Sequence, residues 1–121
     1  MIMPAKASTI CVVDTRPDDY SELLSTAAGE GTRVQFMESA RDALRFQGDE
    51  APELWIINMD LPEMSGADLH SMIHSRFPGV PFFLVGNGYR VEDEMAARSS
   101  GATMYFCKPL QPEWLLTTSN A

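Results

Sequence analysis

The fold is decided by residues 54–66, LWIINMDLPEMSG. The first four residues, Leu54–Ile57, are apolar throughout, which is typical of a strand that is covered on both faces of a parallel sheet. A polar loop follows, and apolar residues then recur at helical spacing, at Leu69, Met72, Ile73 and Phe77. This part of the chain therefore predicts a buried strand, a loop and an amphipathic helix in succession.

The same alternation continues on both sides of this stretch. Further strands are predicted over Thr9–Val13, Arg33–Met37, Val80–Val85 and Thr103–Cys107. Helices are predicted over Asp18–Ala28, from Ala40 to about Gln47, through Leu69–Phe77 up to the break at Pro78-Gly79, and from about Val91 to Ser99, with a short last helix from Pro112. Five strands that alternate with helices indicate an α/β fold, in which a parallel sheet carries helices on both faces.

Composition limits the classes of protein that fit. The 121 residues are 45% hydrophobic and 21% charged, which predicts one globular domain over residues 1–121, with a core from about 9 to 116. The net charge of −8 disfavours direct binding to nucleic acid or to anionic membranes. No apolar run is long enough to cross a bilayer and no signal peptide is recognisable, so we expect a cytoplasmic location.

Cysteine and histidine residues give no sign of a metal site. The two cysteines, Cys11 and Cys107, lack metal-binding spacing and are too few for a disulfide framework. His70 and His74 lie one helical turn apart, but no carboxylate or cysteine partner accompanies them. We expect both histidines at surface or half-buried helix positions.

Polar residues follow the predicted strands where the strands end. Asp14-Thr15, Asn58, Gly86 and Lys108 hold these positions. Because sites in parallel α/β sheets form at the carboxyl ends of the strands, these residues are the candidate functional site.

Three motifs at these ends suggest a family. They are Val12-Val13-Asp14, the loop Pro62-Glu63-Met64-Ser65-Gly66, and Lys108-Pro109 after the last strand. Together they resemble the receiver domain of two-component response regulators, over about Thr9 to Leu116. The resemblance implies a flavodoxin-like (βα)5 sandwich of three layers with strand order 2-1-3-4-5. That order separates Cys11 from Cys107 by three strand spacings, about 14 Å, which is too far for a disulfide.

Compared position by position, the chain keeps only part of the family's phosphorylation site. Family receivers accept a phosphoryl group on an aspartate at the end of the third strand, and here that position is Asn58. Two acidic residues after the first strand help to hold Mg²⁺; Asp14 keeps the first position and Thr15 replaces the second. A Ser or Thr after the fourth strand is replaced by Gly86, whereas the phosphoryl-binding lysine is kept as Lys108.

Two further positions match the family. Asp60 corresponds to a residue that serves the metal through its backbone carbonyl, and Tyr105 to the aromatic switch residue. Since Gly86 offers no hydroxyl group to couple to the switch, we expect the Tyr105 ring to be insensitive to a phosphoryl signal.

These replacements predict a loss of phosphotransfer. A carboxylate can attack phosphorus, but a neutral amide with a delocalised lone pair cannot. Mg²⁺ prefers anionic oxygen ligands, and Asp14 with Lys108 gives a formal charge of zero where the family has −2. We expect weak or absent Mg²⁺ binding, no other cofactor, no enzymatic activity, and a structural ion pair between Asp14 and Lys108.

The resemblance therefore favours an atypical receiver domain that acts as a phosphorylation-independent interaction or dimerisation module. Its partner, or a second copy, would bind the face made by the fourth helix, fifth strand and fifth helix, with Trp114 and Leu115 as candidate interface residues.

Two alternatives stay open. The domain could be phosphorylated at a non-standard residue, such as Asp60, or after deamidation of Asn58; because Asp60 follows the strand end, we expect its carboxylate to point away from the pocket. The domain could also bind a small ligand as flavodoxins do, although Thr15-Arg16-Pro17 lacks a phosphate-binding cradle.

Overall fold

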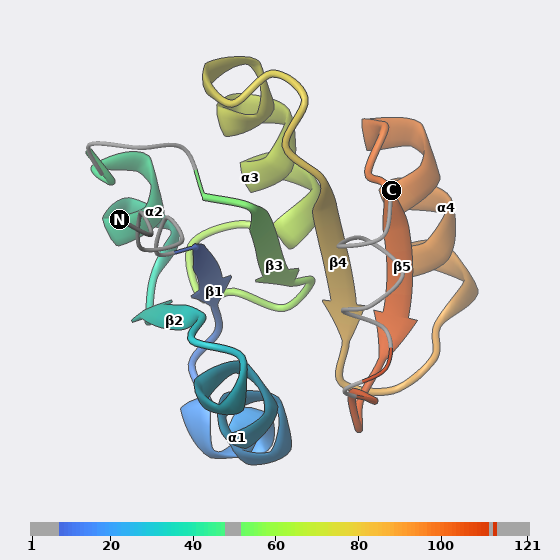
Figure 1. Cartoon of the computed structure of the whole chain (residues 1–121). Coiled ribbons are helices and arrows are strands. Elements are labelled where there is room, and N and C mark those ends of the chain that lie inside the picture. Colours follow the sequence, from blue (N-terminus) through green and yellow to red (C-terminus); the bar gives the residue numbers. More distant parts are fainter. Residues whose placement is uncertain (1–7, 48–51, 112, 114–121) are drawn as a thin grey trace.

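Five parallel strands form the sheet that organises the molecule (Figure 1). The structure is a computed structural model, and it describes residues 8–47, 52–111 and 113. The strands lie in the order β2-β1-β3-β4-β5, as the sequence predicts, and every neighbouring pair is parallel. Their bounds are β1 Thr9–Val13, β2 Arg33–Met37, β3 Leu54–Asn58, β4 Phe82–Gly86 and β5 Met104–Cys107.

Each face of the sheet has its own apolar core. The described helices are α1 Ser21–Gly29, α2 Ala40–Leu44, α3 Gly66–Ile73 and α4 Val91–Ser100, with 3₁₀ turns η1 Pro17–Tyr20 and η2 His74–Arg76. Trp55 and Ile57 of β3 pack with residues of α2, α3 and α4 on one face. Ile56 packs on the other face with Tyr20 and Leu23, beside α1. Alternate residues of β3 therefore serve opposite cores, which is why this strand is apolar throughout.

Several element bounds differ from the sequence prediction, most of them by a single residue, and four differences have a structural consequence. The first helix begins as the 3₁₀ turn η1, with Pro17 at its start, and α2 ends at Leu44 instead of near Gln47. β4 begins at Phe82 rather than Val80, because Pro81 has no N–H to donate to a strand partner. α3 ends at Ile73 and continues as the turn η2. The helix predicted from Pro112 lies outside the described residues.

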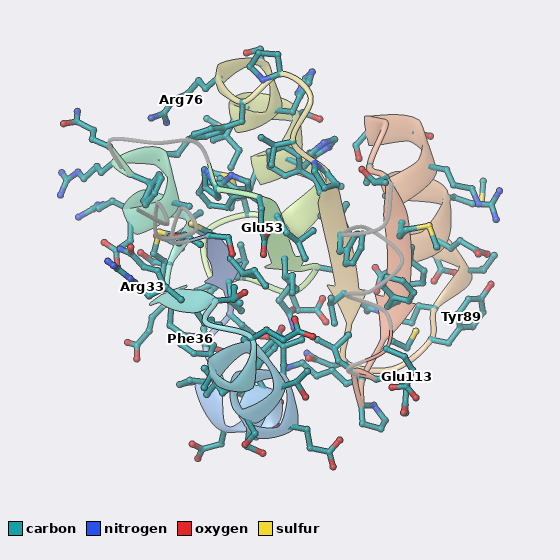
Figure 2. All side chains as sticks on the ribbon, viewed as in Figure 1. Arg33, Phe36, Glu53, Arg76, Tyr89 and Glu113 are labelled. Carbon is teal, nitrogen blue, oxygen red and sulfur yellow. The ribbon has the colours of Figure 1, made fainter. Side chains whose placement is uncertain are left out.

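The short helix α2 is held at both ends by residues from later in the chain. Its capping residue Ser39 accepts a hydrogen bond from the Asp42 N–H at 3.1 Å, and Glu63 accepts one from the Ala40 N–H at 3.1 Å. At the other end, the Arg76 guanidinium donates to the carbonyl oxygens of Leu44 and Phe46, at 2.9 and 2.6 Å. Figure 2 shows Arg76 beyond the far end of α3.

The histidine prediction is wrong for one of the two residues. His70 is buried, with its ring against Phe82 and its Nδ1 3.1 Å from the Ser100 hydroxyl, so it joins α3 to α4. Burial lowers the pKa of His70, and the neighbouring His74, which is exposed, lowers it further. The spacing of apolar residues along one helix could not predict this contact, because the contact depends on how two helices pack together.

Cys11 and Cys107 are both free thiols, and β3 and β4 separate their strands. Burial raises the pKa of the Cys11 thiol to about 12. In the described part of the chain, no helix is long and apolar enough to cross a membrane.

Candidate functional site

The carboxyl ends of β1, β3 and β4 and the start of the segment after β5 meet at one edge of the sheet. β1 pairs with β3 and β3 with β4, so Asp14 and Asn58 follow adjacent strands. Both side chains are almost fully buried, with 2% and 1% exposure. Burial of these polar groups requires hydrogen-bond partners, and the structure supplies them.

The Asp14 carboxylate accepts hydrogen bonds from four donors. Its Oδ2 accepts from the Tyr20 hydroxyl at 2.7 Å and from Asn58 Nδ2 at 2.9 Å, and it lies 2.9 Å from Lys108 Nζ. Its Oδ1 accepts from the Arg16 N–H at 3.0 Å. A carboxylate offers about four acceptor positions, two on each oxygen, so Oδ2 is fully occupied while Oδ1 accepts one hydrogen bond. The ion pair expected between Asp14 and Lys108 is present.

The Asn58 amide is fixed by three hydrogen bonds. Its Nδ2 donates to Asp14 Oδ2 and to Asn87 Oδ1, both at 2.9 Å, and its Oδ1 accepts from the Asp60 N–H at 2.6 Å. Both amide hydrogens therefore point at oxygen atoms. A carboxylate at this position could not make either of those two donations.

Protonation equilibria agree with this arrangement. Burial alone would raise the pKa of Asp14, but the hydrogen bonds from Tyr20, Lys108 and the Arg16 N–H, with the charge of Lys108, hold it below its ordinary value. Burial raises the pKa of Tyr20, and the charge of Asp14 raises it further, so the hydroxyl stays a hydrogen-bond donor. The charged carboxylate and the neutral phenol are thus the stable forms.

Lys108 has a second anionic partner that the sequence analysis did not include. Its Nζ lies 2.8 Å from Asp19 Oδ2, and its side chain is only 10% exposed. Two carboxylates therefore surround one ammonium group, which gives a formal charge of −1 instead of zero. A shallow cleft of about 270 Å³ opens beside these residues and is lined by Arg16, Asp19, Asn87, Lys108 and Pro109.

A second line of polar contacts runs from the buried amide toward α4. Asn87 Nδ2 donates to Asp60 Oδ2 at 3.3 Å, and the Asp60 carboxylate lies 2.7 Å from the Arg90 guanidinium. Arg90 also pairs with Asp93, in the first turn of α4, at 3.1 Å. The Asp60 carboxylate thus contacts Asn87 and Arg90 of the β4–α4 loop.

The remaining predicted positions divide into those inside and outside this cluster. Thr15 is exposed at the rim. Gly66 is required by the loop after β3, because any side chain there would overlap the carbonyl oxygen of Asn58. Gly86 ends β4, and the Tyr105 hydroxyl lies over it. Trp114 and Leu115 lie outside the described residues.

Four contributors to the site were missed: Tyr20 and Asp19 from η1, and Asn87 and Arg90 from the β4–α4 loop. Only the run Asp18-Asp19-Tyr20 after Pro17 carried a signal, since acidic residues at the start of a helical segment face the same strand ends. Within residues 8–47, 52–111 and 113, no three His, Cys, Asp or Glu side chains are grouped so that they could hold a metal ion.

Comparisons with known proteins agree on one family. The sequence profile described as "Response regulator receiver domain" matches residues 10–120. The probable transcriptional regulatory protein TcrX of Mycobacterium tuberculosis is 30% identical over 106 residues, which cover 87% of this chain and 45% of TcrX. A 14.6 kDa protein of Leptolyngbya boryana is 32% identical over 105 residues, covering 85% of this chain and 80% of that protein.

Solved structures show the same fold. The CheY-like receiver domain protein of Methanospirillum hungatei JF-1 superposes with a TM-score of 0.80 at 24% identity, and the match covers 95% of this chain and 92% of the other. The chain spans less than half of TcrX, so the activity of that whole protein does not transfer to it.

Proposed function

Because this chain belongs to the response regulator receiver domain family, whose members act in signal transduction, we propose that it is an atypical receiver that binds a protein partner without being phosphorylated. The observation that carries this proposal is the Asn58 amide, which donates to Asp14 and to Asn87 in the middle of the buried cluster. In this role the domain is a signalling module and not an enzyme.

The chemistry of residue 58 supports the first half of the proposal. An acyl phosphate forms when a carboxylate oxygen attacks phosphorus, and Asn58 has no such oxygen. Its amide oxygen is already bonded to the Asp60 N–H, and its nitrogen lone pair is delocalised. Asp60 is the nearest alternative acceptor in sequence, but Arg90 and Asn87 hold its carboxylate on the loop side.

The charges and hydrogen bonds of the cluster indicate that it binds Mg²⁺ only weakly. A divalent cation needs several free anionic or carbonyl oxygens in a near-octahedral shell. Asp14 already accepts contacts from four donors, three of them on Oδ2, and Thr15 carries no charge. Lys108 sits between Asp14 and Asp19, so its positive charge already takes the place that a cation would fill.

The second half of the proposal places the partner on the surface formed by α4 and β5, which we call the α4–β5 surface. Four of the five exposed large hydrophobic residues in the described parts lie on it or next to it: Tyr89, Val91, Met95 and Met104. Figure 2 shows Tyr89 at the outer edge of the molecule, beside α4. Exposed apolar side chains gathered on one surface favour a protein contact.

A phosphodonor experiment tests the first half. The purified protein is incubated with acetyl phosphate and Mg²⁺ and weighed intact, beside a receiver that is phosphorylated under the same conditions. We expect no added phosphoryl mass on this chain, because the nucleophile is absent. A mass gain that disappears in the variant Asp60→Asn would contradict the proposal and favour phosphorylation at the loop aspartate.

A binding experiment tests the second half. The wild type and two variants, Met95→Glu and Met72→Glu, are used to capture partners from a lysate of the source organism, and self-association is measured by ultracentrifugation. We expect Met95→Glu, on α4, to lose the partner or the dimer, because a charge would be buried in the contact. Met72 is also exposed, at 52% against 64% for Met95, but it lies on α3, so its variant is the control. Equal binding by all three proteins would rule out the α4–β5 surface.

A further inference from the structure

Gly86 ends β4 at a place where the protein has no room for a side chain. A Cβ atom built on Gly86 would lie 2.6 Å from the Tyr105 hydroxyl oxygen and 2.9 Å from the carbonyl oxygen of Gly88. Both distances are below the 3.0 Å that real Cβ atoms respect. The Tyr105 hydroxyl therefore occupies the space that a side chain at position 86 would fill.

The Tyr105 ring is held in this position from several sides. The ring is half-buried and packs against the core beneath α3 and α4. It meets the edge of the Tyr89 ring at a centroid distance of 6.4 Å, and the Cys107 thiol lies 3.5 Å from its hydroxyl oxygen. Burial raises the pKa of Tyr105, which agrees with a hydroxyl that is partly withdrawn from water.

The two backbone segments around this hydroxyl are themselves fixed. The Lys108 N–H donates to the Gly86 carbonyl at 2.9 Å, which joins the end of β5 to the end of β4. The β4–α4 loop is tied to the buried cluster through Asn87, which contacts both Asn58 and Asp60. Neither segment can move away from the ring without breaking hydrogen bonds.

We infer that Gly86 and Tyr105 act as a conformational lock that keeps the α4–β5 surface in one state. The glycine leaves room for the hydroxyl, the hydroxyl braces β5 against the β4–α4 loop, and the ring forms one wall of a hollow of about 290 Å³ between α4 and β5. Glu94, Arg98 and Met104 line the same hollow. If the proposed function holds, the partner surface is presented permanently.

The test adds one methyl group at two glycines of the same loop. Gly86→Ala places the methyl group against the hydroxyl, whereas Gly88→Ala has nothing within 4 Å of its new Cβ. Neither glycine has a positive φ, so both variants keep an ordinary backbone. In NMR spectra, we expect nuclear Overhauser effects between the Tyr105 ring and the Gly86 and Gly88 backbone to disappear in Gly86→Ala and to persist in Gly88→Ala.

A rescue variant separates the lock from general damage to the fold. Tyr105→Phe removes the oxygen at 2.6 Å and leaves the ring carbon Cζ as the nearest ring atom, at 3.4 Å from the new Cβ. We expect Gly86→Ala to lower the urea midpoint clearly in the wild-type background and by less in the Tyr105→Phe background. The remaining loss reflects the contact with the Gly88 carbonyl.

Three results would overturn the inference: unchanged ring contacts in Gly86→Ala, the same loss of midpoint in both backgrounds, or two ring positions in the wild-type spectra. None of these measurements needs a phosphodonor or a partner. A phosphorylated wild-type protein would therefore refute the proposed function while leaving the lock intact, and two ring positions would refute the lock alone.

Discussion

Replacement of Asn58 by aspartate is expected to lower the free energy of unfolding by about 3 kcal/mol at neutral pH without divalent cations. The amide nitrogen donates to the buried oxygens of Asp14 and Asn87, each at 2.9 Å. A carboxylate would remove both donations and place a second negative charge beside Asp14. The loss should shrink in acid, because protonation of one carboxyl group restores a donor. Urea unfolding of the wild type and the variant at several pH values measures this loss of unfolding free energy.

The same variant should become sensitive to Mg²⁺, which the wild type should not. Two facing carboxylates and the nearby carbonyl groups provide hard oxygen ligands, so millimolar Mg²⁺ should restore part of the lost stability. Asn58→Ala is the control, since it removes the same two donors without adding charge and should stay insensitive to Mg²⁺. Equal stabilisation of the wild type by Mg²⁺, or an Asn58→Asp variant as stable as the wild type, would contradict this view of the cluster.

Replacement of Lys108 by methionine is expected to cost about 3 kcal/mol, because it leaves a buried carboxylate without its counter-ion. Lys108 Nζ contacts Asp14 at 2.9 Å and Asp19 at 2.8 Å, with only 10% of its side chain exposed. Chemical denaturation gives the loss. The exposed pair of Arg98 with Glu94, at 3.4 Å, supplies the control: Arg98→Met should cost no more than about 0.5 kcal/mol.

The pH dependence and a double-mutant cycle identify the charge as the cause. Because the pKa of Asp14 is below its ordinary value in the folded protein, the ion pair stabilises the fold fully above about pH 4 and is lost as the pH falls toward the folded pKa. The gap between wild type and Lys108→Met should narrow in acid. Asp14→Asn combined with Lys108→Met should cost less than the sum of the two single losses. Strict additivity would show that the two groups do not interact.

The fold could be predicted from the sequence because each strand carries its own signal. Neighbouring strand residues point to opposite faces of the sheet, and pairs such as Val12-Val13 and Ile56-Ile57 are apolar at both positions. Glycine and proline mark the breaks between elements. What failed were the ends of elements, such as the start of β4, where Pro81 interrupts an apolar run. The first and last residues of an element depend on which backbone N–H groups find a hydrogen-bond partner, and the pattern of apolar residues does not predict this.

The site was predictable for a different reason: the topology of a parallel sheet brings the carboxyl ends of its strands together, independently of the conformation of the loops. Asp14, Asn58 and Lys108 therefore meet as expected. Tyr20 and Asn87 were missed because their side chains reach the cluster from a turn and a loop whose paths carry no periodic signal. Gly86 was interpreted as a missing hydroxyl group, whereas the structure shows that its empty space is taken by Tyr105.

The second helix has a consequence for how the protein assembles. α2 spans only Ala40–Leu44, too few residues to be stable by itself in water. Its two ends are completed by Glu63 and Arg76, which follow it by some twenty to thirty residues. During synthesis these five residues leave the ribosome well before the side chains that stabilise them. Their helical structure must therefore wait for a downstream portion of the chain, so the order of translation and the order of folding differ here.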